Sequence, residues 1–145
     1  MVPRWLNFPS LSKYGDMINI PHLADSPPGA VENNVADYPV AAQESLAVLF
    51  LDHRGAVAHS YQRTDGDGSL VQLNARNIVH EALTHRHERF ILVHNHPSGD
   101  PTPSPADISA TKHLCRIVTA LGLELVDHLI LAPAESFSFR AAGLL

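Results

Sequence analysis

A continuous apolar run at residues 46–51 (LAVLFL) is the feature that most constrains what this chain can fold into. Six consecutive apolar residues match the length of a strand, and such a run is typical of a central strand in a sheet. Residues 52–55 (DHRG) have the composition of a turn, so residues 56–62 are expected to return as the second strand of a hairpin. The compact part of the chain is therefore expected to begin at about residue 42 with a buried strand.

Apolar periodicity further along predicts two helices and three more strands. Asn74 is placed to cap a helix that runs to about His87, and Ser104 is placed to open a second helix. Strands are expected at residues 89–93, 123–132 and 136–139. The inner faces of the helices are expected to hold Ile78, Val79, Ala82 and Leu83 in the first, and Ile108, Thr111, Cys115, Val118 and Leu121 in the second. Because strands and helices mix without strict alternation, the expected fold class is α/β, with a mixed sheet sandwiched by helices.

Residues 1–41 differ from the rest of the chain. Six prolines interrupt any periodic pattern, so we expect an extended or partly disordered arm, with one domain over residues 42–145. The apolar side chains of Trp5, Leu6 and Phe8 leave open whether the arm docks on the domain or on a second chain. The second option would make a homo-oligomer through the arm.

Charge and hydropathy exclude several partners. The net charge of −5 gives no general basic surface for nucleic acid, although a local patch is not excluded. No apolar run approaches the roughly 18 residues that span a bilayer, so no membrane contact is expected. The first residues lack an apolar signal core, and Cys115 is the only cysteine. A cytoplasmic location fits these observations.

Two histidines and an aspartate have the spacing of a metal site. Side chains at positions i and i+2 of an extended segment point to the same side, so His94 and His96 would leave the end of a strand at 90–93 as a fork. Asp107 can return after the intervening loop as a third ligand. Two imidazoles and a carboxylate suit Zn²⁺, and three protein ligands leave a fourth position for water.

Each of these residues also has a purely structural interpretation. Ser104 at the N-cap, proline at the next position and Asp107 at N3 are close to a capping box, a common helix start. The two roles are compatible, because Ser104 can cap the helix while Asp107 faces a metal. Asp127 and His128 could reach the site, but a buried structural pair is the alternative. His80-Glu81 is not a zincin helix, because that motif needs a histidine where Thr84 stands.

A hydrolytic metal site needs an acid–base residue beside it. Glu44 stands immediately before the apolar strand, where an acid can also simply mark the solvated start of that strand. Spacing alone does not choose between this residue and the other candidates. These are Glu32, Glu81, Glu88 and Glu124.

The segment 94–107 (HNHPSGDPTPSPAD) resembles the JAMM motif of MPN/JAB-domain metalloproteases, an upstream Glu, then His-x-His-Pro, then Ser-x-x-Asp. The asparagine between the histidines and the Pro-Ser-Gly after them are similar to the RadC branch, as are residues 44–52, 127–130 and 136–139. The resemblance implies a cytidine-deaminase-like JAB/MPN fold over residues 42–145. It implies one zinc per chain on His94, His96 and Asp107, with water as fourth ligand. It also implies roles for Glu44 as proton carrier and Ser104 as oxyanion donor.

The function expected from the resemblance is a zinc-dependent hydrolase that cleaves a peptide or isopeptide bond with a metal-activated water. Its substrate would be a peptide or protein. One alternative is a DNA-repair-associated accessory protein in which the metal is mainly structural. Against it stand the net charge and an arm too short for the helix-hairpin-helix region usual in RadC proteins. Another alternative is a non-catalytic interaction domain, which the complete ligand set argues against.

Overall fold

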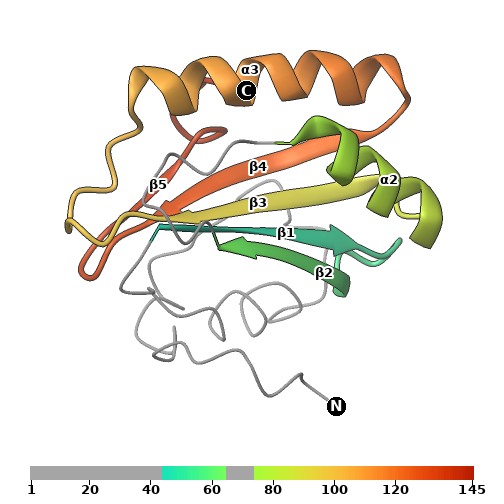
Figure 1. The fold of residues 1–145 in the computed structure, drawn as a ribbon, viewed down its shortest axis with the longest axis horizontal. Helices are drawn as coiled ribbons and strands as arrows, with labels where there is room; N and C mark the ends of the chain where they lie inside the picture. The colour runs from blue at the N-terminus through green and yellow to red at the C-terminus, as the bar shows by residue number, and fades with distance from the viewer. Residues whose placement is uncertain (1–43, 65–73) are drawn as a thin grey trace.

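In this computed structural model, residues 44–64 and 74–145 are described. They form a five-stranded mixed sheet in the order β2-β1-β3-β4-β5, with two helices (Figure 1). The elements are β1 (Ser45–Leu51), β2 (Val57–Thr64), α2 (Ala75–His85), β3 (Arg89–Asn95), α3 (Pro105–Ala120), β4 (Glu124–Leu131) and β5 (Ser136–Ser138). The sheet pairs are antiparallel except for β3 and β4, which are parallel. The predicted α/β class with a mixed sheet is confirmed.

The central position of β1 explains its apolar sequence. This strand pairs with β2 on one side and with β3 on the other, and all seven of its residues are buried. Alternate side chains, Leu46, Val48 and Phe50, pack with both helices into the main core. Within the described residues α2 and α3 therefore cover the same face of the sheet, as Figure 1 shows, so the predicted sandwich with helices on both faces stays a prediction.

The crossover from β3 through α3 to β4 positions the candidate site. Two parallel neighbours in a sheet need such a connection, and α3 supplies it by lying along β4. The N-terminus of α3 therefore lies next to the C-terminal end of β3. The start of β1 lies at this same end of the strands, because Leu46 pairs with His94.

Two predicted helix faces are corrected, because Leu121 is 54% exposed and Leu83 is 62% exposed. Leu83 is five residues after the buried Ile78, about 140° round the helix, and so lies outside the buried face of α2. The buried stripe of α3 is Asp107, Thr111, Leu114 and Val118. Leu121 follows this stripe by one turn but is the C-cap, after the last helical residue Ala120, where its side chain is exposed.

The ends of several elements also differ from expectation, and two of these differences are larger or bear on the site. β3 continues two residues further, to Asn95, because its end is paired on both sides, with β1 and with β4. α2 ends at His85 rather than His87, since Arg86 adopts the left-handed conformation with φ 58°. His94 is thus part of the sheet, whereas only His96 extends beyond it.

Several expectations fall outside the described residues. The Pro-rich arm at 1–41, its contribution to a homo-oligomer and the alternative acid Glu32 all lie there, so the division at residue 42 stays a prediction. None of the helices in the described ranges has the length and apolar character that crossing a bilayer requires.

Candidate metal centre

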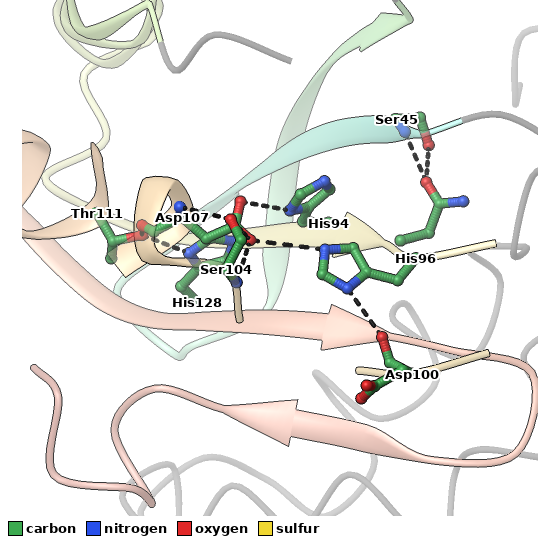
Figure 2. Close-up of polar contacts among 9 residues, drawn as sticks. Ser45, His94, His96, Asp100, Ser104, Asp107, Thr111 and His128 are labelled. Atoms are coloured by element: carbon green, nitrogen blue, oxygen red, sulfur yellow. Dashed lines mark hydrogen bonds and ion pairs between the residues drawn. The ribbon is translucent and has the colours of Figure 1, made fainter. Parts of the chain in front are cut away.

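Three elements meet at the candidate centre: the end of β3, the start of α3 and the start of β1. Figure 2 shows His94 and His96 reaching toward Asp107 from the end of β3. The ring centroids of the two histidines are 4.8 Å apart and nearly perpendicular. His94 is 4% exposed and Asp107 is 8% exposed, so the centre lies at the boundary between core and solvent.

The loop between β3 and α3 orients His96. Gly99 has φ 95°, a left-handed conformation that favours glycine, and it turns the chain back so that the carbonyl oxygen of Asp100 lies 2.9 Å from His96 Nδ1. A carbonyl oxygen only accepts hydrogen bonds, so His96 Nδ1 is the donor, and this contact directs Nε2 toward Asp107. The His96 main-chain N–H donates to the carbonyl of Leu131 at 2.7 Å and ties this segment to the end of β4.

The capping box at the start of α3 orients Asp107. The Ser104 hydroxyl and main-chain N–H donate to Asp107 Oδ2 at 2.6 and 2.7 Å, and the Asp107 N–H donates back to Ser104 Oγ at 3.1 Å. Asp107 Oδ1 faces His94. The capping and ligand interpretations of this segment are therefore compatible in the structure, as the sequence suggested.

The separations between these side chains fit a metal better than they fit hydrogen bonds. Asp107 Oδ1 lies 3.6 Å from His94 Nδ1, and Asp107 Oδ2 lies 3.7 Å from His96 Nε2. Both distances exceed normal hydrogen-bond lengths. Ligands at about 2.0–2.1 Å from a tetrahedral zinc are about 3.3 Å apart, which is close to the observed spacing. Each histidine–aspartate pair is therefore spaced like two ligands of one ion, and the two pairs use different Asp107 oxygens.

Protonation states at the centre also favour a cation. Burial lowers the pKa of His94 below its ordinary value of 6.5, although the Asp107 carboxylate opposes this shift, so the imidazole is neutral near pH 7. Burial tends to raise the pKa of Asp107, but hydrogen bonds from Ser104 outweigh it and leave this pKa below its ordinary 3.8. A neutral imidazole, as at His94, and an ionised carboxylate, as at Asp107, are the forms that bind metals.

Glu44 lies beside the two histidines. Its carboxylate and one ring nitrogen from each of His94 and His96 lie within 4.8 Å of one another. Of the four acids considered that the structure describes, Glu44 alone is close to this centre. Glu81 contacts His59, which pairs with Phe50 at the other end of β1, while Glu124 contacts Arg89 at the start of β3. Glu88 immediately precedes that strand.

A buried clamp that the sequence did not reveal fixes the position of Glu44. Asn95 Oδ1 accepts hydrogen bonds from Ser45 N–H at 2.6 Å and from Ser45 Oγ at 2.7 Å. The clamp joins the start of β1 to the end of β3 on the face opposite the histidines. Because Glu44 directly precedes Ser45, the clamp holds Glu44 next to His94. The only sequence signal was a polar residue between two histidines.

Asp127 and His128 do not act as one pair. Asp127 accepts from the main-chain N–H groups of His128 and Arg140 and from the Ser138 hydroxyl, and is a structural residue. His128 lies on the helix face, where its ring centroid is 6.0 Å from that of His94. Thr111 donates to the Asp107 carbonyl, so His128 Nδ1, 2.8 Å away, donates to Thr111 Oγ1.

The buried His128 predicts an acid-sensitive fold. Burial lowers the pKa of His128 from 6.5 to about 3. Between these values the unfolded chain takes up a proton that the folded chain does not, so stability falls as pH falls from 6.5 toward 3. The expected slope from this residue approaches about 1.4 kcal/mol per pH unit.

Urea unfolding of the wild type and of His128→Gln, both with chelator, measures this slope at pH 7, 6, 5 and 4. We expect the variant to be less stable at pH 7 and to lose less stability than the wild type on acidification. Parallel pH profiles for the two proteins would contradict this assignment.

Comparisons with known proteins identify one family. The sequence model of the RadC-like JAB domain family matches residues 26–144. A UPF0758 protein of Rhodobacter capsulatus is 44% identical over 102 residues, which cover 70% of this chain and 48% of the relative. A UPF0758 protein of Coxiella burnetii is 39% identical over 102 residues, covering 70% and 46%. The UPF0758 protein YsxA of Bacillus subtilis is 36% identical over 122 residues, covering 83% and 52%. The chain spans about half the length of the curated relatives it matches.

Proposed function

This chain belongs to the RadC-like JAB domain family, and on that premise we propose that it is a zinc-dependent hydrolase that cleaves a peptide or isopeptide bond. His94, His96 and Asp107 would hold the metal, one ion at this centre. Glu44 would carry the proton, and Ser104 would help to bind the oxyanion. The substrate would be a peptide or protein.

One observation carries the proposal: His94 and His96 face Asp107 across the centre at separations too long for hydrogen bonds. His96 Nδ1 donates to the Asp100 carbonyl, and this contact directs Nε2 toward the Asp107 carboxylate, 3.7 Å away. A metal ion between these atoms would bind both of them. The hydrogen bond to the carbonyl is also the usual second contact of a metal-binding histidine, because it fixes the ring orientation and tautomer.

The chemistry follows from the same residues. Zinc held by His94, His96 and Asp107 would supply Lewis-acid chemistry and would make a water molecule easier to deprotonate near pH 7. Glu44, close to both histidines, accepts a proton from the attacking water and passes it to the leaving amine. The Ser104 hydroxyl, which donates to Asp107 Oδ2 in this structure, turns toward the oxyanion as charge develops there.

Cleavage assays on the full chain test this proposal. The protein is incubated with a peptide library and with isopeptide-linked peptides, in zinc and in excess chelator. We expect cleavage that chelator abolishes, that zinc restores and that Asp107→Asn lacks. Glu124→Gln, a substitution at the opposite end of the sheet, is the matched control and should cleave like the wild type. The proposal would be refuted if neither substrate set is cleaved. It would also be refuted if cleavage continues unchanged in chelator or in the Asp107→Asn variant.

A further inference from the structure

A second group of metal-binding side chains lies far from the centre described above. His59 comes from β2, while Glu81 and His85 come from α2, and their ligand atoms lie within 4.8 Å of one another. His59 pairs with Phe50, four residues along β1 from Leu46, which pairs with His94. At about 3.3 Å per residue, the two groups are separated by about 13 Å along the strand. They cannot share one ion.

The three side chains converge on one carboxylate oxygen. Glu81 Oε2 lies 2.9 Å from His59 Nε2 and 3.5 Å from His85 Nε2. The two imidazole rings are stacked with centroids 3.9 Å apart and an angle of 27° between their planes. Stacking aligns the rings, so that the same nitrogen of each is directed at the same oxygen.

Rigid parts of the fold hold this geometry. Glu81 and His85 are one turn apart on α2 and so lie on the same side of the helix. Ala82, beside Glu81, is buried in the core and fixes the rotation of α2 over the sheet. The ring of Phe50 stacks on the ring of His59, with the two centroids 5.7 Å apart, and so limits the positions that His59 can take.

Hydrogen bonding alone accounts for only part of this arrangement. It explains the 2.9 Å contact of His59, but the 3.5 Å contact of His85 is long for a hydrogen bond. A single divalent cation, in contrast, can be bound by both imidazole nitrogens and the carboxylate at once.

We infer that His59, Glu81 and His85 form a second metal site, selective for a borderline divalent cation such as Zn²⁺. Two imidazoles and one carboxylate are donors that these ions prefer over Mg²⁺ or Ca²⁺. The side chains are 29%, 24% and 42% exposed, so an ion can enter and keep water in its remaining positions. The bound ion fastens the strand β2, which ends the sheet, to the helix above it.

Zinc titration of the full chain, monitored by calorimetry, tests the inference in a His94→Ala/His96→Ala background. The background removes the first centre, so the outcome does not depend on the proposed hydrolase activity. We expect about one equivalent of zinc to bind there and none after Glu81→Gln is added. His80→Ala, an exposed histidine on the same helix, is the control and should leave the equivalent in place.

Thermal unfolding gives a second readout without the double substitution. Added zinc should raise the melting temperature of the wild type more than that of Glu81→Gln, because binding to the folded chain alone stabilises it. Glutamine keeps the size of the side chain and is partly exposed, so the variant is expected to fold. Three results would each overturn the site. The first is a background protein that binds no zinc, and the second is equal zinc binding with and without Glu81→Gln. The third is the same zinc-induced rise in melting temperature for the wild type and Glu81→Gln.

Discussion

Glu44→Gln is expected to lower the rate of hydrolysis by about 10²–10⁴-fold, the usual contribution of a general acid–base residue. Glutamine retains the size of the side chain but cannot accept a proton from water. Glu44 lies close to His94 and His96, and the proposed ligands, His94, His96 and Asp107, do not include it. Zinc content and thermal stability should therefore stay near those of the wild type. Initial rates on a substrate from the cleavage screen, with metal analysis of the same samples, measure both quantities.

The control for this substitution is Glu88→Gln, an exposed acid just before β3. It should cleave at the wild-type rate. A Glu44→Gln protein that retains full activity would remove this residue from the mechanism. Loss of zinc together with activity would instead make Glu44 a ligand.

Removing either histidine of the first centre is expected to weaken zinc binding by at least about 100-fold, since even outer contacts of a metal site contribute 10–100-fold. The measurement is best made in a Glu81→Gln background, so that only this centre contributes. We expect about one zinc per chain after dialysis in that background, and far less after His94→Ala or His96→Ala is added.

His113→Ala is the matched control, because this histidine is exposed on α3 and points away from the centre's buried stripe. It should retain the full equivalent of zinc. Retention of the full equivalent by both His94→Ala and His96→Ala would exclude the centre.

Local signals in the sequence predicted most of the fold. The apolar run at 46–51 gave the central strand, and Ser104 with its following proline gave the start of α3, because both depend on neighbouring residues. The fork of His94 and His96 and the return of Asp107 lie within one strand, one loop and one helix start. Short-range geometry was therefore sufficient to bring these three residues together.

The remainder depends on contacts between distant parts of the chain. Glu44 was one of several equivalent acids until the pairing of Leu46 with His94 placed it. The clamp joins Ser45 to Asn95, 50 positions later, and no periodic pattern in the sequence indicates such a contact. The cluster around Glu81 was missed because His59 approaches it from a strand 22 residues earlier. The exposure of Leu121 followed from the end of α3 at Ala120, which the apolar pattern did not mark.

The proposed ligands and Glu44 come together over very different distances along the chain. Residues 94–107 contain all three proposed ligands, whereas Glu44 reaches them only when β1 pairs with β3, across 50 positions. Closing a loop about four times longer costs about 1 kcal/mol more in chain entropy. In the proposed hydrolase, the ligands would therefore need only a local loop to meet, whereas the proton carrier would need the pairing of β1 with β3. Metal binding and cleavage would then depend on different parts of the fold.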